Sequence, residues 1–198
     1  MFPIFLKLEG RRCLVVGAGK VAEGKIRGLF DAGASVEVVA PFAVPQIQQW
    51  FGQGVLSWQQ RVFEPRDLDH ASIVIAATPS HEVNTQVFEE AQLRNVLCNS
   101  VDDPENCDFY YPAVVQRGDL QIAISTNGRS PALAQRLRQE LEQQFGPEYE
   151  TWLEELGVSR GQLFATNLDS EARRKLLHEL ASREAFNNRN IVQRGRSN

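Results

Sequence analysis

An apolar run, a glycine-rich turn and a helical pattern follow one another near the start of the chain. Residues 12–16 are nearly all apolar, as is typical of a parallel strand buried on both faces. Gly17, Gly19 and Ala22 come next, and a helical pattern then continues to Gly33, the expected C′ residue. This order predicts the first βαβ unit of a parallel sheet. The apolar residues expected on one side of the helix are Val21, Ile26, Leu29 and Phe30.

The spacing of the two glycines and the alanine is that of a dinucleotide-binding fingerprint. Gly17 permits the tight turn, Gly19 lets the backbone approach a pyrophosphate, and Ala22 allows the helix to pack closely on the strand. The helix N-terminus favours an anion through its free N–H groups and its dipole. We therefore predict that the segment binds NAD or NADP. The alternative is a glycine-rich turn in an α/β protein that binds another ligand.

The end of the second strand does not distinguish the two dinucleotides. An acidic residue that binds the ribose hydroxyls belongs at this position, but the chain has Ala40 and Pro41 there. Glu37 lies inside the strand and is expected to point elsewhere. The sequence is therefore compatible with both NAD and NADP.

The first 112 residues alternate between short strands and helices. Such alternation predicts a Rossmann-like α/β fold, a doubly wound parallel sheet with right-handed crossovers. Helices are expected around residues 20–32, 44–51 and 83–91. The expected strands cover residues 12–16, 35–40, 56–62, 72–77 and 96–99.

The pattern changes after Pro112. Residues 120–125 form an expected strand that has no place in the βα alternation, and an amphipathic helix is expected from Pro131 to Phe145. Beyond this helix every expected element is helical, at residues 149–156 and 171–186. Asp169 or Ser170 is the expected N-cap of the last helix, and the polar, basic tail 187–198 is expected to fray.

Composition bears on the partners and the compartment. The formal net charge of −4 gives no reason to expect nucleic acid as a partner. No stretch approaches the roughly 20 apolar residues that span a bilayer, and no signal-peptide pattern precedes the first strand. The three irregularly spaced cysteines suit reduced thiols in a cytoplasmic protein. The three histidines have no nearby cysteine at metal-ligand spacing, so no built-in metal site is expected.

Enzymes with parallel sheets place their chemistry beyond the carboxyl ends of the strands. Thr78 follows the fourth strand, where it either hydrogen-bonds the cofactor or caps the next helix. Asp102 follows the fifth strand, beside Asp103. It is a candidate catalytic carboxylate, although an Asp-Asp-Pro sequence is also common turn chemistry.

Several motifs in a fixed order resemble those of precorrin-2 dehydrogenases. These are the enzymes of siroheme synthesis, and they include the N-terminal half of bifunctional siroheme synthases. The motifs are residues 17–25, Asn99 with Asp102, Phe109 with Pro112, and residues 125–131. The resemblance covers residues 1–145 closely and the helical end loosely.

The resemblance implies an NAD-dependent oxidation of precorrin-2 to sirohydrochlorin. Some family members also insert ferrous iron, as a substrate, to give siroheme. The family's proposed catalytic aspartate falls on Asp102, acting as general base or in metal insertion. The expected cofactor contacts are Gly17, Ala18, Gly19, Lys20, Val21, Ala22, Ala40, Pro41, Thr78 and Asn99.

The family also forms a homodimer through the segment after the sheet. A dimer would cover the apolar stripe of the helix that begins at Pro131, although the stripe can instead pack on the chain's own sheet. The expected domains are an NAD(P)-binding domain over 1–112, a strand-plus-helix dimerisation segment over 113–146 and a small helical domain over 147–198. The stripe consists of Leu133, Leu137, Leu141 and Phe145.

The implied substrate is a tetrapyrrole bearing eight carboxylates, so local rather than overall charge must bind it. Ser130 as N-cap and Pro131 at N1 start a helix whose free N–H groups can hold carboxylates, together with nearby hydroxyls and a guanidinium. The alternative is an ordinary capped helix start. The expected substrate contacts are Ser125, Thr126, Asn127, Gly128, Arg129 and Ser130.

Two departures from the family and two rival functions complete the predictions. After Thr78 many relatives carry an acidic residue, but here residues 79–81 are Pro-Ser-His. No methyltransferase domain is present within the 198 residues, so methylation of uroporphyrinogen is expected from another protein. One rival function is a non-catalytic NAD(P)-binding redox sensor or regulatory module. The other is a chelatase or tetrapyrrole carrier with a decayed dinucleotide site, against which the intact fingerprint counts.

Overall fold

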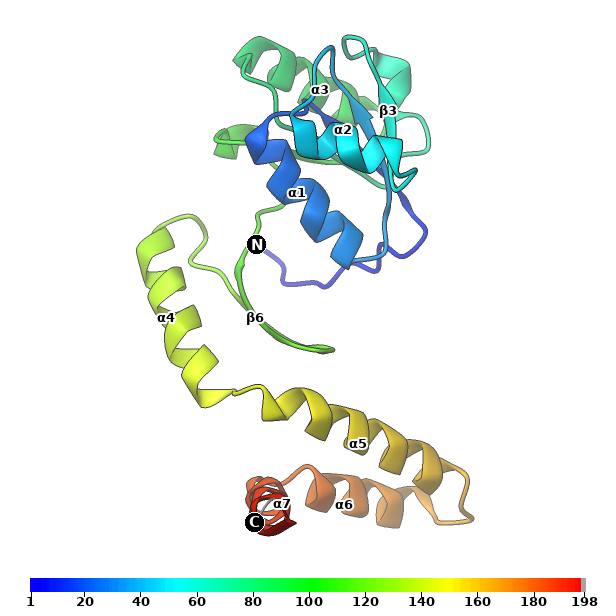
Figure 1. Ribbon diagram of the computed structural model, residues 1–198, viewed down its shortest axis with the longest axis vertical. Coiled ribbons are helices and arrows are strands. Elements are labelled where there is room, and N and C mark those ends of the chain that lie inside the picture. The colour runs from blue at the N-terminus through cyan, green and yellow to red at the C-terminus, as the bar shows by residue number, and fades with distance from the viewer. Residues whose placement is uncertain (197–198) are drawn as a thin grey trace. The chain divides into compact units, whose positions relative to one another are not determined.

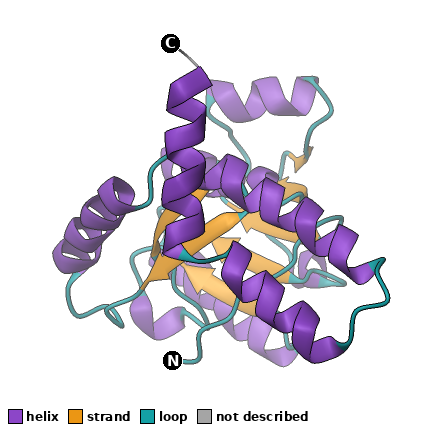
Figure 2. Cartoon of the chain, turned by 90° about the horizontal axis from the view of Figure 1, so that it is seen from below, coloured by secondary structure: helices purple, strands orange, loops and turns teal. Residues whose placement is uncertain are grey.

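A five-stranded parallel sheet forms the centre of the first of two compact units, Met1–Tyr111. The structure is a computed structural model and describes residues 1–196. The strands lie side by side in the order β3-β2-β1-β4-β5, so the chain builds outward from β1 in both directions. Figure 2 shows the strands surrounded by helices. The predicted Rossmann-like sheet is confirmed. The strands are β1 (Arg12–Val16), β2 (Ser35–Val39), β3 (Ser57–Gln59), β4 (Ile73–Ala76) and β5 (Leu97–Ser100).

Helices cover both faces of this sheet. Helices α1 (Lys20–Asp31) and α2 (Pro45–Gly52) lie on one face and α3 (His81–Leu93) on the other (Figure 1). Successive residues of a strand point to opposite faces, so Val15 packs toward α1 and α2 while Leu14 packs toward α3. Both side chains are fully buried, which explains the continuous apolar run of β1.

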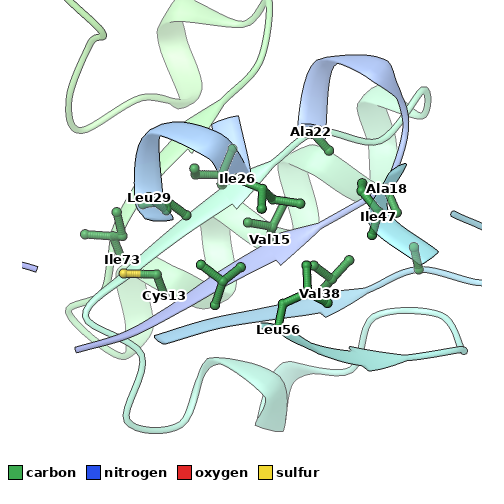
Figure 3. Close-up of a cluster of buried hydrophobic side chains, with 13 residues drawn as sticks. Cys13, Val15, Ala18, Ala22, Ile26, Leu29, Val38, Ile47, Leu56 and Ile73 are labelled. Carbon is green, nitrogen blue, oxygen red and sulfur yellow. The ribbon is translucent and has the colours of Figure 1, made fainter. Parts of the chain in front are cut away.

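Figure 3 shows the apolar cluster that fixes α1 on the sheet. Ala22, Ile26 and Leu29 point from α1 toward Val15 of β1, and all four are buried. Val21, expected on the same side, is instead 51% exposed. The prediction was wrong because residue 22, rather than 21, lies one helical turn before residue 26 on the buried face.

An ion pair with a buried carboxylate fixes the segment that leads into β4. Asp67, in the short 3₁₀ helix η1 (Pro65–Leu68), accepts hydrogen bonds from the guanidinium of Arg61 at 2.5 and 2.8 Å and from the N–H of Glu64 at 2.9 Å. Burial alone would raise the pKa of Asp67, but these bonds outweigh it and hold the pKa below its ordinary value. The carboxylate is therefore ionised and paired in the folded state.

Replacing Asp67 with alanine is expected to lower the free energy of unfolding by about 1–3 kcal/mol, because the hydrogen bonds of this buried carboxylate to the half-buried Arg61 and to the N–H of Glu64 would be lost. Because the folded pKa of Asp67 is lowered, its stabilisation is present above the ordinary value of 3.8 and is lost as the pH falls through the folded pKa. Urea unfolding from pH 7 downward measures both effects. Asp69→Ala, at a carboxylate 59% exposed, is the control and should cost about 1 kcal/mol or less. An equal loss in the two variants would contradict the prediction.

The second unit begins at Pro112 and consists of a hairpin followed by helices (Figure 1). Helix α4 packs on the antiparallel hairpin β6–β7, where Val115 and Ala134 are buried. The ring of Tyr149 stacks 4.5 Å from that of Phe186 and so joins α5 to α7. The elements are β6 (Ala113–Arg117), β7 (Leu120–Ile124), α4 (Pro131–Gln144), α5 (Glu148–Phe164), α6 (Ser170–Leu180) and α7 (Arg183–Arg196).

Several predicted boundaries in this unit are corrected. The strand at 120–125 is confirmed as β7, but its partner β6 was not predicted. The helix expected at 171–186 is two helices, which are separated at Ala181 and Ser182. The helix expected at 149–156 extends to Phe164, and the tail expected to fray is helical up to Arg196, whereas 197 and 198 lie outside the described residues.

The apolar stripe of α4 is only partly covered by its own unit. Leu137, Leu141 and Phe145 are half-buried, whereas Leu133 is 40% exposed. Packing of the stripe on the chain's own hairpin therefore accounts for most of it. Within residues 1–196, no helix combines the length and the apolar character needed to cross a bilayer.

Elsewhere in the first unit one strand is shorter than predicted. The strand expected at 56–62 is confined to Ser57–Gln59, one of the two edge strands of the sheet. Its neighbour Leu56 is buried, but Val62 is 67% exposed, so the apolar residues of this stretch do not share one buried face.

Candidate functional site

The predicted site residues of the first unit lie at one edge of the sheet. Backbone hydrogen bonds hold the strand ends level: Gly17 N–H donates to the last residue of β2 at 2.9 Å, Ala77 N–H to the last of β1 at 2.8 Å, and Val101 N–H to the last of β4 at 2.9 Å. This edge holds the carboxyl ends of the parallel strands, at the position where the strand order reverses. Ligands of doubly wound sheets bind at such an edge.

Gly17 makes the turn from β1 into α1 in a backbone conformation that favours glycine. Its φ is +102°, and a Cβ there would lie 2.4 Å from the carbonyl oxygen of Ala77. The end of β4 therefore passes directly against the Gly17 backbone. Only a residue without a side chain fits this turn.

Gly19 forms the N-cap of α1 and leaves the start of the helix open. The first helical bond runs from Glu23 N–H to the carbonyl of Gly19 at 3.0 Å, so the N–H groups of residues 20–22 precede the helical ladder. Among the described residues no side chain caps this end, and a Cβ at Gly19 would meet no heavy atom within 4 Å. The arrangement fits a pyrophosphate, because the free N–H groups and the helix dipole meet an uncovered backbone.

The end of β2 carries no acid, in agreement with its sequence. Ala40 is buried, with its carbonyl accepting from Trp58 Nε1 at 2.9 Å, and Pro41 is exposed. Glu37 accepts from the guanidinium of Arg12 at 2.7 and 2.9 Å, which confirms that it is engaged elsewhere. The strand therefore offers the ribose no carboxylate from its own end.

Thr78 is locked into the loop after β4 by Asn84. The Thr78 hydroxyl donates to Asn84 Oδ1 at 2.7 Å, and Asn84 Nδ2 donates to the Thr78 carbonyl at 3.0 Å. Ser80, not Thr78, caps α3, because its hydroxyl accepts from Val83 N–H at 3.3 Å. The alternative role of Thr78 as a helix cap is thus wrong. Asn84, 5% exposed, was not selected from sequence, where only a polar residue on the expected buried side of α3 could have indicated it.

Asn99 shapes the loop that follows β5. Its Nδ2 donates to the Phe109 carbonyl at 2.8 Å, and the side chain is buried. Asp103, one residue beyond Asp102, accepts from Asn106 at 2.7 Å. The same oxygen of the Asp103 carboxylate lies 3.1 Å from Nδ1 of His81 in α3. These contacts fix the loop at both ends.

Asp102 itself is exposed and stands at a φ of +60°. Asp and Asn adopt this left-handed conformation more readily than most residues, because their short polar side chains tolerate it. The carboxylate is therefore presented at the edge of the sheet on a tight turn just beyond β5. Lys25 of α1 lies near enough for the Asp102 charge to act on its pKa, and sequence reasoning did not select this lysine.

The predicted substrate contacts belong to the second unit. Ser130 caps α4, accepting from Leu133 N–H at 3.2 Å, and Thr126 Oγ1 accepts from Ser130 N–H at 3.2 Å. The predicted N-cap Ser130, followed by Pro131 at N1, is therefore confirmed. The exposed residues of the turn, which remain predicted substrate contacts, are Ser125, Asn127, Gly128 and Arg129.

Two of the cysteines are buried, and the described residues contain no cluster of metal-ligating side chains. No group of three His, Cys, Asp or Glu residues gathers there in a way that could hold a metal ion. Cys13 and Cys98 are free and buried, and burial raises the pKa of their thiols to about 11 and about 12. Both are therefore protonated packing residues rather than nucleophiles.

The chain shares sequence and structure with proteins of siroheme synthesis. Residues 4–113 match a family model described as putative NAD(P)-binding, and residues 117–144 match a model described as sirohaem biosynthesis protein central. A siroheme synthase of Acinetobacter baylyi is 46% identical over 72% of this chain but 31% of that protein. A siroheme synthase of Methylobacillus flagellatus is 47% identical over 71% of this chain and 30% of that protein.

A solved structure agrees over the whole chain. It is named as SirC, a precorrin-2 dehydrogenase, and it matches with a TM-score of 0.81 and 27% sequence identity, covering 100% of both chains. The first unit carries the fingerprint, and the next segment carries the sirohaem-biosynthesis match. The chain therefore belongs to the putative NAD(P)-binding family whose model covers residues 4–113, and it is similar to siroheme synthases and to a precorrin-2 dehydrogenase.

Proposed function

We propose that this protein oxidises precorrin-2 to sirohydrochlorin with NAD as the hydride acceptor. The observation that carries the proposal is the exposed Asp102 carboxylate at the same strand edge as the open N-terminus of α1. A carboxylate beside a dinucleotide site is suited to remove a proton while a hydride leaves. The match to the sirohaem-biosynthesis model and the similarity to SirC support the choice of substrate.

The chain's own groups bind, orient and accept a proton. The N-terminus of α1 binds the pyrophosphate through the N–H groups beyond Gly19. A bound nicotinamide dinucleotide supplies the hydride acceptor. Asp102 accepts the proton that the substrate loses, so that precorrin-2 and NAD⁺ give sirohydrochlorin, NADH and a proton. Thr78 and Asn99 hold the two loops that flank this position.

The remaining parts of the proposal concern the second unit and a second reaction. The capped turn 125–130 and the start of α4 bind substrate carboxylates, with Arg129 as the charged group. The partly exposed stripe of α4, with Leu133 at 40% exposure, is covered in a homodimer. We further propose that the site around Asp102 inserts ferrous iron, as a substrate, into sirohydrochlorin.

An anaerobic assay tests the proposed reaction. The purified protein is mixed with enzymatically made precorrin-2 and either NAD or NADP, and sirohydrochlorin is followed by its absorbance. Product that depends on one dinucleotide is the expected result and also gives the nucleotide preference, and ferrous iron is then added to test chelation. Cofactor binding without any product would overturn the proposal and favour a non-catalytic NAD(P) sensor.

A further inference from the structure

Lys25 is a half-buried cation on the helix that carries the dinucleotide fingerprint. It lies in α1, three residues after Ala22, and its Nζ stands 3.5 Å from the centroid of the Tyr111 ring. Tyr111 ends the first unit, eleven residues beyond the last residue of β5. The side chain of Lys25 therefore reaches from α1 to the segment that follows β5. A cation at this distance from an aromatic face is attracted by the ring.

The charges around Lys25 come from the same loop. Burial lowers the pKa of its ammonium group, while the charges of Asp102 and Cys107 act in the opposite direction. Lys20 on the same helix is different, since its side chain is 84% exposed and pairs with Glu23 at 2.9 Å. The side chain of Lys25 therefore lies against this loop, at Tyr111, rather than extending into solvent.

The loop has little regular structure with which to fix the Asp102 carboxylate. Between β5 and β6 it contains one short 3₁₀ helix, η2 (Pro104–Asn106), and Asp102 precedes this helix on a left-handed turn. Asn99 holds the loop at Phe109 and His81 lies against Asp103, so neither holds the Asp102 carboxylate. The side chain of Lys25 contacts the far end of this loop at Tyr111, and the charge of Asp102 acts on its pKa.

We propose that Lys25 is a positioning residue that couples the cofactor helix to the loop that carries the catalytic carboxylate, holding the Tyr111 end of that loop at a fixed place relative to α1. The inference rests on the proposed function, since it concerns the carboxylate of that reaction. A small displacement of a reacting group lowers turnover strongly even where binding is retained. The role therefore predicts a loss in kcat that is separate from cofactor affinity.

Two substitutions at Lys25 separate charge from bulk. Lys25→Met keeps the length of the side chain but removes the charge, and is expected to lower kcat by about 10²-fold with little change in KM for NAD. Lys25→Arg keeps the charge and should recover most of the activity. Arg27→Met removes a cation 61% exposed on the same helix and should leave kcat near wild type. Wild-type kcat in Lys25→Met, or equal losses in the Met and Arg variants at Lys25, would overturn the proposal.

A second measurement needs no substrate and so separates this inference from the proposed reaction. The chain has four lysines, so reductive ¹³C-methylation gives few NMR signals to titrate; they are Lys7, Lys20, Lys25 and Lys175.

The signal of Lys25 should report its neighbours directly. It is expected to titrate below the ordinary lysine range because the amine is partly buried. In Asp102→Asn the Lys25 titration should fall further, since the carboxylate that favours the charged amine is gone, while Lys20 should not move. An unchanged Lys25 titration in Asp102→Asn would overturn the placement of Lys25 beside this loop even if the wild-type protein makes sirohydrochlorin. A shifted titration in a protein that makes none would overturn the proposed reaction alone.

Discussion

Asp102→Asn is expected to lower the rate of sirohydrochlorin formation by about 10²–10⁴-fold, the usual contribution of a general base. Asparagine has the size of aspartate and also tolerates the φ of +60° found at this position. The turn after β5 should therefore keep its shape, and the loss should fall on proton removal rather than on folding. The measurement is the anaerobic turnover of precorrin-2 at saturating NAD.

The backbone at Asp102 decides which variant is informative. Asp102→Ala would place an alanine in the left-handed region, which adds strain of about 1 kcal/mol or more to any loss of chemistry. Glu105→Gln is the matched control, because Glu105 is an exposed carboxylate three residues further along the same loop. Its turnover should stay near wild type, and NAD affinity should be unchanged in both variants. Full turnover in Asp102→Asn would remove Asp102 from the mechanism.

The features that sequence predicted well are those with a local cause. The buried run of β1, the turn at Gly17 and the C′ position of Gly33 each follow from short-range backbone or packing rules. The N-caps Asp169 and Ser130 are likewise confirmed, because each accepts from an N–H group two or three residues ahead. The order of these signals was sufficient to predict the parallel sheet.

Strand β6 and its hairpin with β7 were not predicted, although the sequence carries signals for both. Val115 is buried between two less buried neighbours, and Gly118 adopts a φ of +54° between the strands. Both signals, an alternating strand and a glycine turn, were present in the sequence. The break between α6 and α7 is different, since Ala181 and Ser182 contain neither glycine nor proline. The close packing of Phe186 on Tyr149 is a tertiary contact that no local pattern predicts.

The candidate site was predicted where it depends on strand ends and missed where it depends on loop packing. Asp102 follows β5 directly, so the rule for parallel sheets locates it. Asn84 acts on Thr78 in the loop just before its own helix, and Lys25 acts on Tyr111, far along the chain. Nothing in a helical pattern indicates which loop a polar side chain will meet. The positioning residues therefore needed the structure.

The two glycines of the fingerprint are expected to fail in different ways when replaced by alanine. Gly17→Ala places a Cβ 2.4 Å from the carbonyl oxygen of Ala77, at a φ of +102°. Backbone strain of about 1–3 kcal/mol and a clash that costs about 1–3 kcal/mol should together lower the free energy of unfolding markedly. Urea unfolding measures this loss, and NAD binding should also fall because the turn must move.

Gly19→Ala tests the cofactor site with the fold left in place. The new Cβ meets no heavy atom of the described residues within 4 Å, and the φ of −85° is ordinary for alanine, so unfolding should change little. The methyl group would nevertheless stand where the pyrophosphate must approach the backbone, and NAD affinity should fall strongly. Calorimetric titration with NAD, beside urea unfolding of both variants, distinguishes the two effects. A pyrophosphate that lies against the Gly19 backbone must meet the new methyl group. Wild-type NAD affinity in a stable Gly19→Ala protein would therefore mean that the pyrophosphate does not bind at the start of α1.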